Sequence, residues 1–134
     1  MAHFVLDSYA LLAYFRNEEG GEKVEQLLNE AVADKHELHM TCINAGEVYY
    51  MAHRKDGADK AALVWKALLQ FPIHIAEADM PFTYKAASLK AKYKFSYADA
   101  FAAALTISKK ATLITGDKEF ESVVGEVNFK VKYL

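Results

Sequence analysis

Short runs rich in β-branched and aromatic residues alternate along this chain with longer segments in which apolar residues recur every three or four positions. Strands separated by helical segments favour a parallel sheet covered by helices on both faces, because parallel neighbours need long crossovers. The expected strands are residues 3–6, 38–43, 73–76, 112–115 and 128–133, and the expected helices are residues 8–16, 22–33, 44–55, 58–71, 81–93, 97–109 and 118–123. The pattern predicts an α/β fold with a central parallel sheet of about five strands.

The size of the chain predicts one domain over residues 1–134, since 134 residues with 53% apolar side chains can bury a single core. The only cysteine, Cys42, cannot form an intramolecular disulfide, and we expect it to be an inert residue in the second strand. The first residues lack a charged segment followed by a long apolar one, and no apolar run approaches the roughly 18 residues of a membrane-spanning helix. These features predict a soluble, cytoplasmic protein.

Four acidic residues stand where the ends of strands and the starts of helices meet. Asp7 directly follows the first strand, and Asp117 follows residues 112–115 after one glycine. Glu47 and Asp99 lie about one turn into their expected helices. Because ligands of parallel sheets bind beyond the carboxyl ends of the strands, we expect the four carboxylates to converge at one edge.

Each of these acids also has a structural explanation. Asp7 and Asp117 could cap helices, while Asn44 with Glu47 and Ser96 with Asp99 have the spacing of capping boxes. Capping does not explain the apolar neighbours of Glu47 and Asp99, which make an uncompensated charge costly. A divalent cation removes that cost, and an oxygen-only ligand set favours Mg²⁺ or Mn²⁺ over Zn²⁺.

The order and setting of these acids resemble those of the PIN-domain nucleases, and in particular the VapC-type toxins of toxin–antitoxin operons. Four segments carry the resemblance: Phe-Val-Leu-Asp-Ser-Tyr-Ala-Leu-Leu at residues 4–12, Ile-Asn-Ala-Gly-Glu-Val at 43–48, Tyr-Ala-Asp-Ala-Phe-Ala-Ala-Ala-Leu at 97–105 and Leu-Ile-Thr-Gly-Asp-Lys-Glu-Phe at 113–120. These four segments follow one another in the family's order across nearly the whole chain, and no acid of the pattern is missing.

The resemblance implies a PIN-like domain in which Asp7, Glu47, Asp99 and Asp117 bind Mg²⁺ or Mn²⁺, with Thr115 as a supporting hydroxyl. It also implies an endoribonuclease that acts as the toxin of a type II pair, leaves 5′-phosphate ends and is silenced by a cognate VapB-like antitoxin. Asp7 and Asp99 are the first choices for direct ligands. Two alternatives remain open: a housekeeping PIN nuclease of RNA processing or decay, and a non-catalytic protein-binding module whose acids only cap helices.

Basic residues are unevenly distributed. Up to Asp79 the chain has 7 basic and 13 acidic residues, whereas from Met80 it has 9 basic and 5 acidic ones. Arginine is scarce, so we expect lysines of the second half to contact RNA. The candidates are Lys85, Lys90, Lys92, Lys94 and Lys118.

The histidines give no recognised zinc spacing. His36 and His39 are three positions apart but lack further ligands nearby in sequence, so they are interpreted as surface polar residues at a strand start. His3, His53 and His74 are isolated in the sequence and are interpreted in the same way. The helices over residues 44–55 and 58–71 carry more large apolar side chains than one small core absorbs. A homodimer is therefore expected, with Tyr50, Trp65 and Leu69 as candidates for its interface.

Overall fold

A computed structural model describes residues 1–126 and 129–134. These residues contain one five-stranded sheet in which all neighbouring strands are parallel. The strands are β1 (Ala2–Leu6), β2 (His36–Thr41), β3 (Ile73–Ala76), β4 (Thr112–Thr115) and β5 (Lys130–Tyr133). Their order across the sheet is β3-β2-β1-β4-β5. The predicted α/β class and parallel sheet are confirmed. Residue 128, which was expected to begin the last strand, lies outside the described residues.

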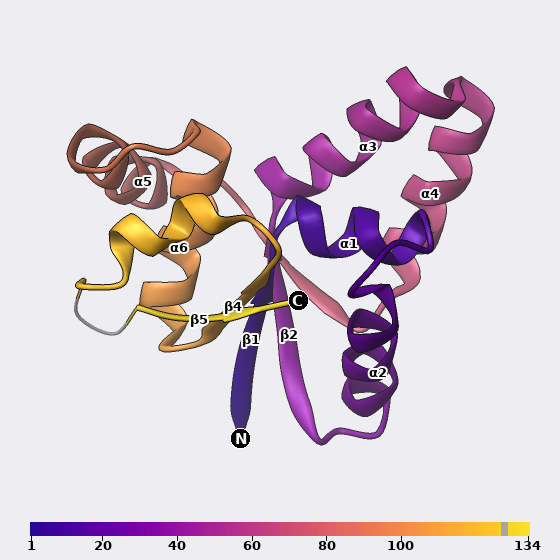
Figure 1. The fold of residues 1–134 in the computed structure, drawn as a ribbon, viewed down its shortest axis with the longest axis horizontal. Helices are drawn as coiled ribbons and strands as arrows, with labels where there is room; N and C mark the ends of the chain where they lie inside the picture. Colours follow the sequence, from indigo (N-terminus) through magenta and orange to yellow (C-terminus); the bar gives the residue numbers. More distant parts are fainter. Residues whose placement is uncertain (127–128) are drawn as a thin grey trace.

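Helices cover both faces of the sheet (Figure 1). One side carries α1 (Ser8–Phe15), α2 (Gly21–Val32), α3 (Cys42–Asp56) and α4 (Ala58–Gln70), and the other carries α5 (Met80–Lys92), α6 (Tyr97–Lys109) and the short 3-10 helix η1 (Lys118–Val123). Alternate strand residues enter the two cores: Val5 and Leu113 pack on the α5–α6 side, and Leu6 and Ile114 on the α1–α2 side. Within the described chain, none of the helices combines the length and apolarity needed to cross a bilayer.

The predicted helix caps Asp7 and Ser96 are confirmed, and Asp79 is a further cap. The carboxylates of Asp7 and Asp79 accept hydrogen bonds of 2.9 Å from the backbone N–H groups of Ala10 and Phe82, at the starts of α1 and α5. Ser96 caps α6 by accepting a 3.1 Å bond from the backbone of Asp99. Each cap satisfies an N–H group that the first helical turn leaves unpaired.

The junction of β2 and α3 differs from the prediction. The strand ends at Thr41, and the helix begins at Cys42, two positions earlier than expected. Thr41 is the cap, because its hydroxyl oxygen accepts a 2.9 Å bond from the backbone N–H of Asn44. Asn44 is therefore not a cap, and Cys42 is a half-buried helical residue rather than a strand residue.

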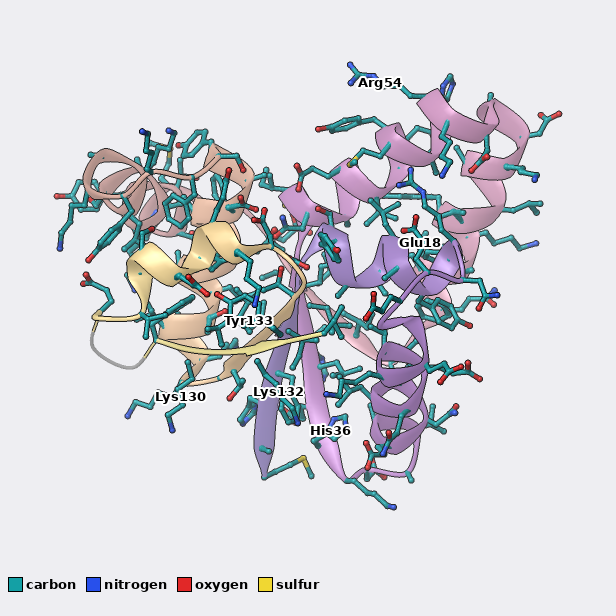
Figure 2. The ribbon with its side chains drawn as sticks, in the orientation of Figure 1. Glu18, His36, Arg54, Lys130, Lys132 and Tyr133 are labelled. Carbon is teal, nitrogen blue, oxygen red and sulfur yellow. The ribbon has the colours of Figure 1, made fainter. Side chains whose placement is uncertain are left out.

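Helices α3 and α4 form a hairpin that extends outward from the end of the sheet (Figure 1). They are joined at Gly57, whose φ of +92° favours glycine. Arg54 projects from the outer part of this hairpin, away from the sheet (Figure 2). The hairpin leaves Tyr49, Tyr50, Trp65 and Leu69 exposed.

Candidate active site

The four predicted acids lie together at the carboxyl edge of the sheet. Asp7 follows β1, Asp117 follows β4 after one residue, and Glu47 and Asp99 lie in the first turns of α3 and α6. All four line the same cavity, whose volume is about 430 Å³. The parallel strands thus deliver residues separated by up to 110 positions in sequence to one place, as the strand pattern predicted.

Asp7 is the most buried of these acids, with 2% of its surface exposed. One carboxylate oxygen accepts the bond from Ala10 described above, and the other accepts a hydrogen bond from the hydroxyl of Thr115 on β4. Burial raises the pKa of Asp7 to about 7, which the bonds from Thr115 and Ala10 oppose and the charges of Asp99 and Asp117 reinforce. An ionised Asp7 therefore needs a compensating positive charge.

Asp99 and Asp117 form the centre of the cluster. One oxygen of each and one of Glu119 all lie within 4.8 Å of one another. Burial raises the pKa of Asp99 to about 6, and the carboxylates of Asp117, Glu47 and Glu119 add to the rise. Glu119 was not among the predicted residues, although its position two residues after Asp117 at the start of η1 is a signal that could have identified it.

A hydrogen-bond network fixes Glu47. Its Oε1 accepts bonds from the Ser8 hydroxyl at 3.0 Å and from the side-chain amide of Asn44 at 3.1 Å. Asn44 is fully buried, and its Oδ1 accepts a 2.7 Å bond from the hydroxyl of Thr41. Asn44, taken as a cap in the sequence, instead orients the carboxylate of Glu47.

Thr115 links two of the acids. Its hydroxyl donates to Asp7 and accepts a 3.0 Å bond from the backbone N–H of Asp117. The side chain is fully buried in β4. It therefore fixes the relative positions of Asp7 and Asp117.

The chemistry of this cavity suits a hard divalent cation. Among the described residues, no lysine, arginine or histidine forms an ion pair with Asp7, Glu47, Asp99 or Asp117. The groups are carboxylate oxygens, which Mg²⁺ and Mn²⁺ prefer, and the burial that raises two of their pKa values is relieved by a cation. The residues fit the predicted type of ion.

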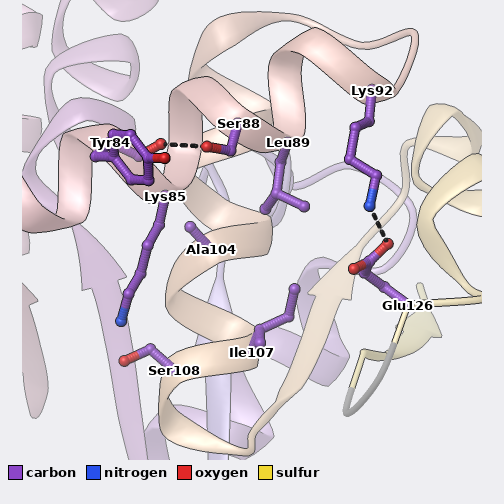
Figure 3. Close-up of a pocket in the computed structure, with 9 residues that line it drawn as sticks. All are labelled: Tyr84, Lys85, Ser88, Leu89, Lys92, Ala104, Ile107, Ser108 and Glu126. Atoms are coloured by element: carbon purple, nitrogen blue, oxygen red, sulfur yellow. Dashed lines mark hydrogen bonds and ion pairs between the residues drawn. The ribbon is translucent and has the colours of Figure 1, made fainter.

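The positive charge that borders the cavity differs from the expectation. Of the described residues that line it, Arg16 at the end of α1 is the basic one, and its buried Nε has no hydrogen-bond partner in the part of the chain that the structure describes. Lys85 and Lys92 line a separate cavity of about 360 Å³ between α5 and α6, where Lys92 pairs with Glu126 at 3.4 Å (Figure 3). Lys118 lies 4.0 Å above the ring of Tyr133. The excess of basic residues in the second half of the sequence therefore did not indicate which basic side chain borders the acids.

Solved structures that share this fold include two VapBC structures and a VapC toxin. VapBC2 of Rickettsia felis, bound to a promoter DNA fragment, has a TM-score of 0.73 and 15% identity, with 98% of each chain covered. DNA-bound VapBC of Salmonella typhimurium has a TM-score of 0.75 and 14% identity, covering 99% of this chain and 98% of that one. Mycobacterium tuberculosis VapC20, a sarcin-ricin loop cleaving toxin, has a TM-score of 0.71 and 16% identity, covering 91% of this chain and 95% of that one.

At these identities the likeness concerns the fold, and no curated protein sequence gives a significant match. The family model of the PIN domain matches residues 4–126. That range includes the strand ends and helix starts that form the acidic cavity. The chain therefore belongs to the PIN domain family.

Proposed function

We propose that this chain is a metal-dependent endoribonuclease and the toxin of a type II toxin–antitoxin pair. The carrying observation is the cavity in which, among the described residues, buried and half-buried carboxylates form no ion pair with a basic side chain, while burial raises the pKa values of Asp7 and Asp99. The PIN family match and the toxins that share the fold support the same activity. Since its substrate would be cellular RNA, the proposed place of action is the cytoplasm.

In this proposal Asp99 and Asp117 hold Mg²⁺ or Mn²⁺ with Asp7 and Glu47, and Glu119 joins them at the rim. The ion, when bound, supplies Lewis-acid chemistry that acidifies a water and stabilises charge on the departing oxygen. Thr115 keeps Asp7 in place, whereas Ser8 and Asn44 orient Glu47.

Hydrolysis requires a water aligned with the scissile P–O bond, and the carboxylates position that water. The new P–O bond forms as the P–O3′ bond breaks, which leaves a 5′-phosphate and a 3′-hydroxyl. The proton lost by the water passes to a carboxylate of the cluster, and the departing O3′ gains one from solvent. Arg16 borders the same cavity, so its guanidinium is the proposed contact for a flanking phosphate.

The proposal is tested by incubating purified protein with total RNA in Mg²⁺ or Mn²⁺ and mapping the new ends. We expect 5′-phosphate ends at a few defined positions, and none after chelation of the metal. Cleavage that continues in EDTA would contradict the proposed chemistry, and intact RNA under all conditions would favour a protein-binding module. Growth arrest on expression, relieved by a neighbouring small antitoxin gene, distinguishes the toxin from a housekeeping nuclease.

Thr115→Val is expected to lower RNA cleavage roughly 10- to 100-fold, as is typical when a group that orients a metal ligand is lost. Valine keeps the shape of threonine but cannot donate to Asp7. Thr115→Ser is the matched control because it keeps the hydroxyl. Equal rates for the two variants in a single-turnover assay would show that the hydroxyl has no role.

The α3–α4 hairpin carries an exposed apolar patch. Trp65 and Leu69 on α4 are 38% and 61% exposed, and the rings of Trp65 and Tyr49 form a T-shaped pair with their centroids 5.9 Å apart. An exposed apolar patch of this kind is typical of a protein-binding surface. We propose that it supports a homodimer, and that a VapB-like antitoxin is the other partner, as in the toxin–antitoxin complexes that share the fold.

Light scattering at micromolar concentration is expected to give the mass of a dimer, and Leu69→Glu is expected to give that of a monomer, because burying a carboxylate in an apolar interface is costly. Val32→Glu is the control, since Val32 is 70% exposed at the end of α2 and outside the hairpin. A monomeric parent protein would contradict the proposed assembly.

A further inference from the structure

A second group of possible metal ligands lies near the amino-terminal ends of β1 and β2. His3 Nδ1 lies 3.0 Å from His39 Nε2 and 3.2 Å from a carboxylate oxygen of Glu37, and His39 Nε2 lies 3.8 Å from that same oxygen. The register of the parallel strands β1 and β2 brings the group together. His3 of β1 is paired with Glu37 of β2, and Val5, two residues after His3, is paired with His39. The three side chains share the face of the sheet that carries α6.

The separations suit a tetrahedral zinc ion. Zinc binds histidine nitrogen and carboxylate oxygen at about 2.0–2.2 Å, so neighbouring ligand atoms around it lie roughly 3.3–3.6 Å apart. The three observed distances bracket this range, and small side-chain rotations equalise them. Two imidazoles and one carboxylate are also a donor set typical of zinc sites, unlike the oxygen-only acidic cavity.

The interpretation of His36 and His39 as surface residues was wrong, because both side chains are buried, and on opposite faces of the sheet. His36 lies on the opposite face of the sheet, toward α2 (Figure 2), with its Nε2 3.7 Å from a carboxylate oxygen of Glu30. The partner of His39 is His3, 36 positions away, and His3 was interpreted as an isolated side chain. His74 on β3 lies next to His39, with its ring centroid 5.3 Å from that of His39.

The charges around the group are balanced. Burial, followed by the nearby ammonium of Lys109 and the neighbouring histidines His3 and His74, lowers the pKa of His39 to about 4, so its imidazole is in the neutral form that binds metals. Glu37 supplies a negative charge that favours a cation. Lys109, in the last turn of α6, opposes one.

We propose that His3, Glu37 and His39 bind a Zn²⁺-type divalent transition ion at a site separate from the acidic cavity. Three residues of β1 lie between His3 and Asp7, so the two residues are roughly 13 Å apart along an extended strand. An ion held from both β1 and β2 would fasten these neighbouring strands together. Its effect is on stability, and it is independent of the proposed nuclease chemistry.

Zinc binding is measured by calorimetry on the whole protein with Mg²⁺ in large excess, so that Mg²⁺ competes for the acidic cavity. We expect one zinc ion per chain, and an affinity at least tenfold lower in His3→Gln and in Glu37→Gln. Both side chains are only half-buried, so equal melting temperatures in EDTA check that these variants fold. Co²⁺ should give a visible absorption band in the parent protein that His3→Gln loses.

His53→Gln is the matched control, because it removes an exposed histidine of α3 and should leave the affinity unchanged. Lys109→Gln should tighten binding by removing the opposing charge. Zinc should also raise the melting temperature of the parent protein but not that of His3→Gln. Parent-like zinc affinity in both His3→Gln and Glu37→Gln would overturn the proposal.

Discussion

Asp99→Asn is expected to lower the rate of RNA cleavage in Mg²⁺ about a thousandfold while the protein remains folded. Asp99 shares the centre of the cluster with Asp117 and Glu119, and an amide brings no charge to a cation there. A catalytic metal ion contributes several kcal/mol to the transition state, and each 1.36 kcal/mol is a factor of ten in rate. The backbone bond from Asp99 to Ser96 is retained, so α6 keeps its cap. Single-turnover cleavage of a mapped RNA measures the effect.

Asp79→Asn is the control for this experiment and for Asp7→Asn. Asp79 caps α5 with the same 2.9 Å backbone bond that Asp7 forms at α1, but it does not line the cavity. We expect parent-like cleavage for Asp79→Asn and a large loss for Asp7→Asn. If Asp7→Asn and Asp99→Asn both cleave at the parent rate, these carboxylates have no catalytic role and the proposed site is wrong.

Asp7→Asn is expected to raise the melting temperature of the metal-free protein at pH 7.5 by roughly 5 °C. The pKa of Asp7 rises from its ordinary 3.8 to about 7 on folding. Between these pH values the folded state holds more protons than the unfolded state, so stability falls as pH rises, and above pH 7 the cost reaches a few kcal/mol. Asparagine removes the charge and can still accept the hydrogen bond from the backbone of Ala10. For a domain of this size, each kcal/mol of added stability raises the melting temperature by a few degrees.

Melting curves of the two proteins between pH 4.5 and pH 8, recorded in EDTA, measure this effect. The gap between Asp7→Asn and the parent should widen as pH rises and should narrow when Mg²⁺ is added, because the ion stabilises the ionised parent. Asp79→Asn should follow the parent at every pH, since Asp79 is exposed. A gap that does not change with pH would mean that the buried charge of Asp7 is not the cause.

Local sequence determined most of the secondary structure and the positions of the four acids. The strands Ile73–Ala76 and Thr112–Thr115 and the helix Tyr97–Lys109 have their predicted bounds, because alternation, helical period and the Ser96 cap are signals read within a few residues. The placement of Asp7 and Asp117 followed from the same logic, since an acid after a parallel strand faces the binding edge. Thr41 was missed as a cap because Asn44 offered an equally good local signal.

The tertiary structure alone decided which side chains meet. Parallel strands are joined by long crossovers, so nothing local sets the register that pairs Val5 with both His39 and Leu113. That register puts His3 beside His39, and the packing of α1 against α3 decides that Arg16, rather than a lysine, borders the acids. The sequence therefore determined the elements and their carboxyl-end acids, whereas the partners of those acids depend on contacts between distant segments that no local pattern encodes.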